Sequence, residues 1–203
     1  MSREIELKFQ VGADRLAGVR RAVATTRAER VAMAARYFDT EDGALGRAGV
    51  ALRLRREGAR WVQTLKAQGA GVLQRLEHEV EVPAAQGRAA VPDLACHAGT
   101  PAGERLAELL AAWQAQGRVP PLVERYAVTF RRTRRVLATA GARVEMALDE
   151  GEITHGHGTA RRRVPLCELE FELQAGEPAA LLALAGRWAA RHGLWLDTRS
   201  KAH

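Results

Sequence analysis

The stretch "EIELKF", residues 4–9, alternates charged and apolar side chains with a period of two. Successive side chains of a strand point to opposite faces of a sheet, so Glu4, Glu6 and Lys8 are expected on one face. Ile5 and Phe9 are then expected on the other. The charged face of this strand either meets solvent or surrounds a charged ligand, and the rest of the chain bears on that choice.

The same alternation recurs along the chain. "VALRLR" (residues 50–55) places Arg53 and Arg55 on one face, and "WVQTLK" (residues 61–66) places Thr64 and Lys66 together. Seven or eight strands are predicted in all, and turn signals at residues 57–58 and 149–151 are expected to separate several of them. The later charged faces carry Glu77, Glu79, Glu145, Asp149, Glu168 and Glu170, and the strand predicted at residues 125–136 is crowded with arginines.

Three segments between the strands have the apolar period of an amphipathic helix. They are residues 13–25, residues 102–116, and a segment that begins at Pro178, runs to about His192 and ends at Gly193. Proline in the first turn and glycine just past the end are typical helix boundaries. No duplicated motif divides the chain beyond the acidic strands at its two ends. The sequence therefore predicts a single α+β domain over residues 1–203.

Composition narrows the class of protein. The 203 residues are 47% hydrophobic, which is ordinary for a globular domain. No apolar run of about 18 residues and no export leader is apparent, so we expect a cytoplasmic protein without a membrane partner. The two cysteines, Cys96 and Cys167, lie far apart and are expected to be free thiols. The net charge of +7 favours an anionic partner.

Three strands carry an acid-x-acid pair on one face: Glu4 with Glu6, Glu77 with Glu79, and Glu168 with Glu170. Neighbouring carboxylates in a partly enclosed site repel by roughly 4 kcal/mol at 4 Å, so something must offset their charge. Carboxylate oxygens are the ligands that Mg²⁺ and Mn²⁺ prefer. The arrangement that suits all the strands is an eight-stranded antiparallel closed β-barrel with a polar lumen and helices packed outside.

Inward-facing arginine and lysine side chains favour a multiply charged anion, because guanidinium groups match phosphate oxygens bidentately. Metal ions held by the acidic pairs would bridge the same oxygens. Together these residues point to a triphosphate or short polyphosphate. Nucleic acid is not expected as a partner, because inward carboxylate pairs would repel its backbone.

These motifs resemble the CYTH domain, or triphosphate tunnel metalloenzyme, superfamily. The resemblance rests on Glu4-x-Glu6-x-Lys8, "YFDTEDGAL" (residues 37–45), "LRLR", "TLK", "QRLEHEVEV", "VEMALDEGEI", "ELEFEL" and the terminal "SKA", all in the order of the family. It covers essentially the whole chain and is greatest to the bacterial inorganic triphosphatase branch. In that branch a helical CHAD domain often follows the CYTH domain, so the resemblance allows for a C-terminal CHAD domain in the full-length protein.

The resemblance implies roles for individual residues. Phosphate binding falls to Lys8, Arg53, Arg55, Lys66, Arg132 and Lys201, with Arg132 chosen over Arg131 and Arg125. Glu4, Glu6, Glu168 and Glu170 would hold a metal ion, Mg²⁺ or Mn²⁺. Glu77 and Glu79 would act in catalysis with Lys8, near a second metal ion or the water that it activates, and Glu145 and Asp149 would assist as ligands.

The function that the resemblance implies is metal-dependent hydrolysis of inorganic triphosphate to pyrophosphate and phosphate. The alternative from another class is a polyphosphate-binding module without turnover. A nucleoside or thiamine triphosphatase, or a class IV-type adenylyl cyclase, are alternatives within the same fold. The acidic pairs favour an enzyme, because binding alone needs only the basic residues.

Overall fold

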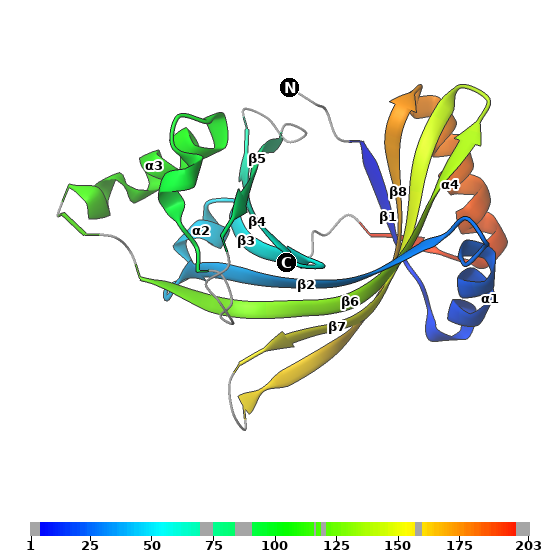
Figure 1. Cartoon of the computed structure of the whole chain (residues 1–203), viewed down its shortest axis with the longest axis horizontal. Coiled ribbons are helices and arrows are strands. Elements are labelled where there is room, and N and C mark those ends of the chain that lie inside the picture. The colour runs from blue at the N-terminus through cyan, green and yellow to red at the C-terminus, as the bar shows by residue number, and fades with distance from the viewer. Residues whose placement is uncertain are drawn as a thin grey trace.

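The computed structural model describes residues 5–69, 75–83, 91–115, 117–118, 121–156 and 160–197. Within these ranges the chain forms one antiparallel sheet with helices on its outer face (Figure 1). In sheet order the strands are β5 (Arg75–Val82), β4 (Arg60–Gln68), β3 (Val50–Glu57), β2 (Glu29–Thr40), β6 (Leu122–Thr139), β7 (Ala142–His155), β8 (Arg162–Gly176), β1 (Glu6–Gln10) and β9 (Trp195–Leu196).

The sheet is strongly curved. β2 and β6 form the middle of its concave face, β3 to β5 rise on one side, and β7, β8 and β1 rise on the other (Figure 1). The convex face of each side is covered by helices. These are α2 (Ala44–Arg47) and α3 (Pro101–Gln114) on the first side, and α1 (Ala13–Val23) and α4 (Pro178–His192) on the second.

The predicted eight-stranded closed barrel is wrong on both counts. The described residues form nine strands, and no hydrogen-bonded pairing joins β5 to β1 or β9. β1 is short, and its second edge is already occupied: Phe9 and Gln10 pair with β9, and the Asp197 amide donates to the Lys8 carbonyl at 2.8 Å. Closure would also bring the acidic faces of β1 and β5 together, which like charges oppose.

Alternation sets which face of each strand is buried. Leu52, Leu54 and Leu65 are fully buried on the outer face of β3 and β4, where they pack with Leu106 and Leu110 of α3. On the other side, apolar residues of β1, β7 and β8 pack against α1 and α4. On these two sides the apolar faces therefore lie outside under the helices and the charged faces line the concave side, as the sequence predicts. β2 and β6 in the middle of the sheet differ, because buried Met33, Tyr37 and Val128 face inward there.

Helix boundaries follow the local signals. The Thr100 hydroxyl caps α3 by accepting a 3.0 Å hydrogen bond from the Gly103 amide, and Pro101 stands at the first position. α4 begins at Pro178 and ends before Gly193, whose left-handed backbone (φ 62°) favours glycine. Within the described residues, no helix has both the length and the apolar character needed to cross a membrane.

Two local features differ from expectation. The predicted turn at residues 149–151 is wrong, because β7 continues through Gly151 to His155. Gly151 is required there by close packing: a Cβ atom at this position would lie 2.0 Å from the Thr129 carbonyl oxygen and 2.5 Å from the Phe130 Cα. The turn at Glu57-Gly58 is confirmed, since β3 ends at Glu57 and Gly58 has a φ of 61°.

The "YFDT" motif ends β2 and starts α2. The Asp39 carboxylate accepts hydrogen bonds from the amides of Leu45 (2.8 Å) and Gly46 (2.9 Å), and the Thr40 hydroxyl accepts one from Ala44 (2.8 Å). These bonds satisfy the first amides of the helix. The aspartate and threonine of this motif therefore have a structural role at a strand-to-helix turn.

Candidate active site

Strand register gathers charged side chains on the concave face. Directly paired residues of antiparallel strands point to the same side, and β1 pairs Glu6 with Glu172, Lys8 with Glu170, and Gln10 with Glu168. Through β7, the same rows continue to Glu145, Ala147 and Asp149. We call this set the acidic side: Glu6, Glu145, Asp149, Glu168, Glu170 and Glu172.

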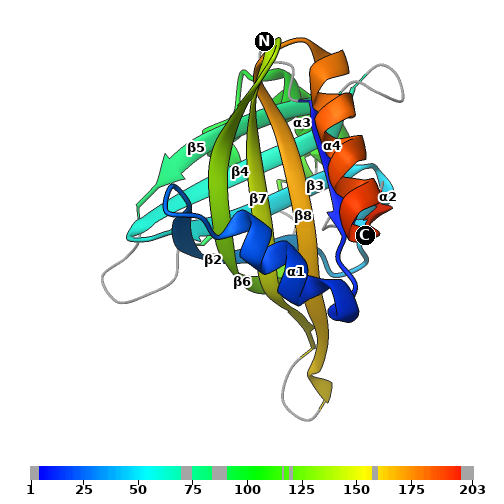
Figure 2. The same ribbon diagram turned by 90° about the vertical axis from the view of Figure 1, so that its right-hand side faces the viewer.

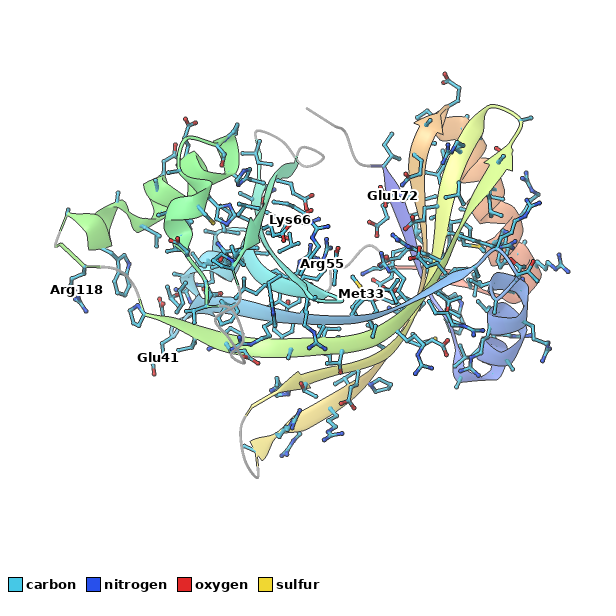
Figure 3. All side chains as sticks on the ribbon, in the orientation of Figure 1. Met33, Glu41, Arg55, Lys66, Arg118 and Glu172 are labelled. Atoms are coloured by element: carbon cyan, nitrogen blue, oxygen red, sulfur yellow. The ribbon has the colours of Figure 1, made fainter. Side chains whose placement is uncertain are left out.

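The opposite side of the concave face is basic. Arg53 pairs with Thr64, and Thr64 with Glu79, while Lys66 pairs with Glu77. We call Arg53, Arg55 and Lys66 the basic side. Figure 3 shows Lys66 and Arg55 on one side of the concave face and Glu172 on the other, with Met33 of β2 between them.

Three carboxylates of the acidic side are deeply buried, whereas Glu6 is exposed. Asp149, Glu168 and Glu170 expose only 0%, 3% and 8% of their surface. Arg132 of β6 donates to both oxygens of Asp149, at 2.7 Å each, and also contacts Glu170. Lys8 Nζ lies 3.5 Å from Glu168 Oε1. Cations of the chain therefore compensate the buried carboxylates, which is what makes their burial tolerable.

The guanidinium group of Arg132 stays protonated. Burial lowers the pKa of its guanidinium, but the hydrogen bond to Asp149 and the charges of Glu170 and Asp149 outweigh burial and raise the pKa above its ordinary value. The register places Arg132, the arginine chosen from the sequence over Arg131 and Arg125, on the concave face opposite Asp149. Arg131 pairs with Glu150 on the outer face.

Sequence reasoning missed two inward-facing residues on the acidic side. Arg134 lies two residues beyond Arg132 on the same face of β6, and its guanidinium reaches Glu29 at 2.9 Å and Glu145 at 3.8 Å. Gln10 donates to Glu168 at 3.2 Å and to Asp197 at 2.8 Å. The period of two that selects Arg132 also selects Arg134, and the period that selects Lys8 also selects Gln10.

The basic side is organised around Glu79. Its Oε1 accepts a 2.8 Å hydrogen bond from the Thr64 hydroxyl and lies 3.3 Å from Arg53 Nη2 and 3.5 Å from Arg55 Nη2. Arg53 Nη2 also donates to the Thr64 hydroxyl at 3.0 Å. Glu79 therefore contacts both guanidinium groups, and Thr64 links it to Arg53. Arg55 has a second acidic partner, because its Nε lies 2.7 Å from Glu57 Oε1.

Two pKa shifts describe the field on this side. Burial and the charge of Arg53 lower the pKa of Arg55, against the opposing charge of Glu79. Burial alone would raise the pKa of Glu79. The hydrogen bond from Thr64 and the charges of Arg55 and Arg53 together lower it by more than burial raises it, so the net shift of the pKa is downward. Glu79 therefore stays ionised and is a weak proton acceptor. An additional anion beside Arg55 would stabilise the charged form of its guanidinium group.

Aromatic and aliphatic side chains of β2 and β6 separate the two charged sides. The rings of Tyr37 and Tyr126 stack at a centroid distance of 4.4 Å and pack with Ala35 and Val128. Burial raises the pKa of Tyr126, so its hydroxyl stays neutral. The middle of the concave face is therefore apolar, which strengthens the interactions of the charges on either side of it.

The donor set fits a hard divalent cation in its chemistry, because the acidic side offers carboxylate oxygens. In the part of the chain that the structure describes, no three His, Cys, Asp or Glu side chains converge as a ready metal cluster. Arg132 and Lys8 engage the carboxylates of Asp149, Glu170 and Glu168. A metal ion would therefore have to exchange with these cations for the same oxygens.

The residues predicted for the site lie on the concave face wherever the structure describes them. Glu4 and Lys201 lie outside the described residues. Those brought together are Glu6, Lys8, Glu145, Asp149, Glu168, Glu170 and Arg132 on one side, and Arg53, Arg55, Lys66, Glu77 and Glu79 on the other.

Solved structures share this architecture. A putative adenylyl cyclase from Hippeastrum, described as having a dominant triphosphatase activity, superposes with a TM-score of 0.56 at 21% identity over 98% of this chain and 92% of its own. A putative adenylate cyclase from Bacillus halodurans gives 0.59 at 17% identity over 98% and 97%. A Pyrococcus horikoshii protein gives 0.53 at 21% over 97% and 94%. Residues 2–203 match the CYTH domain, and the chain belongs to that family.

Proposed function

We propose that this protein hydrolyses inorganic triphosphate to pyrophosphate and phosphate with the help of a divalent metal ion. The observation that carries the proposal is the opposition of an acidic and a basic side across one concave face. A triphosphate complexed with a metal ion presents both the negative oxygens that the basic side attracts and the cation that the acidic side attracts.

The basic residues would hold the phosphates. Glu79 contacts Arg53 and Arg55, Glu57 also pairs with Arg55, and Lys66 Nζ lies 3.0 Å from Glu77 Oε1. Orientation of a guanidinium before the substrate arrives lowers the entropic cost of binding. Lys8, Arg132 and Lys201 are proposed as further phosphate contacts from the other side.

The acidic residues would hold the metal ion. Glu6, Glu168 and Glu170, with Glu4, are the proposed ligands, and Glu145 and Asp149 would assist. Mg²⁺ or Mn²⁺, when bound, supplies charge neutralisation and a water molecule of lowered pKa. Lys8 and Arg132, which contact these carboxylates, are also proposed phosphate contacts, so phosphate oxygens would compete with the carboxylates for the two cations.

Glu77 and Glu79 are proposed to act in the hydrolytic step by orienting groups. Because its pKa is lowered, Glu79 is better suited to accept a hydrogen bond from a positioned water than to remove a proton from that water. In the reaction, the water oxygen would form a bond to the terminal phosphorus, the bond from that phosphorus to the bridging oxygen would break, and pyrophosphate would leave. The proton that the water loses would pass to the released pyrophosphate or to solvent.

The test is phosphate release from a panel of substrates. Inorganic triphosphate, ATP, thiamine triphosphate, pyrophosphate and long-chain polyphosphate would be offered with Mg²⁺, with Mn²⁺ and with EDTA. We expect the fastest release from triphosphate, its loss in EDTA, and little release from pyrophosphate. Tight binding of triphosphate without release under either metal would instead identify a binding module. Formation of cyclic AMP from ATP would identify a cyclase.

A further inference from the structure

The convex face of the sheet carries a second basic region, away from the candidate active site. Figure 2 shows α1 lying across β6, β7 and β8, with β2 beside it. A groove of about 1230 Å³ lies here, and residues of α1, β2, β3 and β6 line it. Its floor includes the small side chains of Ala32 and Ala34, which leave room above the sheet.

Arginines from three adjacent strands and a helix surround this groove: Arg56 of β3, Arg30 of β2, Arg131 of β6 and Arg20 of α1. Register fixes their order. Ala34 pairs with Arg56, Ala32 pairs with Arg131, and Arg30 pairs with Thr133. These positions alternate with Met33 and Val31, which belong to the opposite face of the sheet. The arginine row is therefore outside, behind the concave face.

The positive charge of the groove is largely uncompensated. Among its described lining residues the acid is Glu150, and Arg20 binds it through Nη2 at 2.5 Å and Nε at 3.1 Å. Arg30, Arg56 and Arg131 are exposed, and none of them has an ion pair or hydrogen bond from its side chain within the described parts of the chain. Three guanidinium groups thus face solvent along one groove.

We propose that this groove binds a chain of inorganic polyphosphate. Arg56 and Arg30 stand at register positions four residues apart along β2, or about 13 Å at the rise of a strand. A linear chain lets each guanidinium take a different phosphate, with bidentate contacts that suit arginine better than lysine. The hydroxyl of Thr129, which is exposed in the same groove, adds a neutral donor.

The lining favours polyphosphate over other polyanions. Phe130 is the aromatic residue of the groove, but its ring packs on the other face with the cluster of Ala35, Tyr37 and Val128. Among the residues that the structure describes, the groove thus offers no ring on which a base of single-stranded nucleic acid could stack, and such stacking is the usual source of affinity for it. An acidic protein partner would need an apolar anchor, and the described outward-facing residues of the floor, such as Ala32 and Ala34, offer small side chains.

The experiment measures binding of fluorescently labelled long-chain polyphosphate to the whole protein by anisotropy. The groove variant combines Arg30→Gln, Arg56→Gln and Arg131→Gln. A matched control combines Arg143→Gln, Arg187→Gln and Arg191→Gln, which removes the same charge from exposed positions on β7 and α4. A second variant, Arg53→Ala with Lys66→Ala, removes two cations from the concave face.

We expect the groove variant to bind polyphosphate at least tenfold more weakly, and the control to change by less than threefold. The slope of log affinity against log salt should fall by on the order of two, from the loss of three phosphate contacts. The concave-face variant should lose affinity for triphosphate and keep most of its affinity for polyphosphate. This outcome does not depend on hydrolysis, so it separates the groove from the proposed function.

Three results would overturn the proposal. In the first, the groove variant and its control bind polyphosphate equally well. In the second, the concave-face variant loses all polyphosphate binding, which would assign that binding to the candidate active site. In the third, a single-stranded RNA oligonucleotide binds the groove more tightly than polyphosphate does, and the groove variant abolishes it. Circular dichroism of each variant would establish that the exposed substitutions leave the fold intact.

Discussion

Arg132 donates two parallel hydrogen bonds to Asp149, one from Nε and one from Nη2, each 2.7 Å long. The two residues face each other on paired strands, and Asp149 has no exposed surface. Bidentate geometry of this kind gives the strongest ion pairs that side chains form. The pair therefore supports the buried acidic side as well as contributing a cation to it.

Replacing Arg132 with alanine should destabilise the fold, because it leaves Asp149 and Glu170 buried with less positive charge beside them. We expect the free energy of unfolding to fall by about 3 kcal/mol, the lower range for breaking a buried ion pair. Urea denaturation followed by circular dichroism measures the change. The smaller substitution Arg132→Lys should cost less, since it keeps the charge and loses the second hydrogen bond.

Arg131 provides the control. It is the neighbouring residue on the same strand, but its side chain is exposed on the opposite face. Arg131→Ala should change the free energy of unfolding by no more than about 0.5 kcal/mol, as is usual for exposed positions. Equal destabilisation by the two alanine substitutions would contradict a supporting role for the Arg132–Asp149 pair.

Thr64 should matter for triphosphate affinity, although it carries no charge. Its hydroxyl donates to Glu79 and accepts from Arg53, so Thr64→Val keeps the shape and removes both hydrogen bonds. We expect Arg53 to lose its orientation and triphosphate to bind about fivefold more weakly, in line with about 1 kcal/mol for a hydrogen bond. Calorimetric titration with triphosphate measures the affinity.

Thr64→Ser is the matched control for this prediction, because it keeps the hydroxyl. Its affinity should stay within twofold of the unmodified protein. The same titrations with pyrophosphate would show whether the effect is specific to the longer ligand. An unchanged affinity in Thr64→Val would mean that Glu79 alone is enough to hold Arg53.

Gly151 should tolerate no side chain, because β6 passes too close to it. A Cβ atom would meet the Phe130 Cβ at 2.6 Å as well as the backbone of Thr129 and Phe130. Gly151→Ala therefore forces β6 and β7 apart, and we expect a loss of about 2–3 kcal/mol, as for overpacking in a core. Thermal unfolding measures the change as a lower midpoint.

The control for Gly151 is Gly186 in the middle of α4, where a Cβ atom would meet nothing within 4 Å. Gly186→Ala should stabilise the protein by about 0.5–1 kcal/mol, because alanine is the better helix former. The two substitutions add the same methyl group, so opposite signs would trace the effect of Gly151→Ala to the contact with β6.

Much of the concave face could be predicted from periodicity alone. Where charged and apolar residues alternate, as in β1, β3 and β5, the inward face follows directly from the sequence. β2 does not show this pattern. Its inward face is apolar, with Met33 and Tyr37 buried, and its outer face carries arginine and alanine. The usual facing in this sheet is reversed there, so a rule that places apolar side chains on the outer face assigns β2 the wrong way round.

The openness of the sheet could not be predicted in the same way. Closure depends on whether the two edge strands meet in register, which is a property of the curvature of the whole sheet and not of any strand alone. The pairing of Asp197 and residues 195–196 with β1 is a long-range contact that no local pattern indicates. Ion pairs such as Arg132 with Glu170 likewise join residues far apart in the sequence.

A pair of histidines, buried His97 and half-buried His78, connects the outer face of β4 and β5 to the short 3₁₀ helix at Leu94–His97. His97 is fully buried, and its Nδ1 lies 2.9 Å from the Nδ1 of His78. Gln63 Nε2 donates to the Asp93 carbonyl at 2.7 Å and lies 2.9 Å from His97 Nε2. Since the Gln63 amide is a donor there, His97 Nε2 is the acceptor, and neutral His97 carries its proton on Nδ1.

Protonation of His97 should therefore weaken the fold, because it would place a proton on Nε2 facing the Gln63 amide. Burial and the charge of His78 lower the pKa of His97 to about 4, against the opposing charge of Asp93. In the unfolded chain its pKa is about 6.5. Between these values the unfolded state binds more protons, so the contribution of His97 to stability is complete above about pH 6.5 and falls as the pH is lowered toward 4.

His97→Gln should flatten this part of the profile of stability against pH, because a neutral amide takes the place of the ring. His155→Gln, at an exposed position on β7, should leave it unchanged. Urea midpoints at intervals from pH 7 to pH 4 measure the slopes. If His97→Gln and the unmodified protein lose stability in parallel over that interval, the acid sensitivity lies elsewhere, and the histidine pair is not its source.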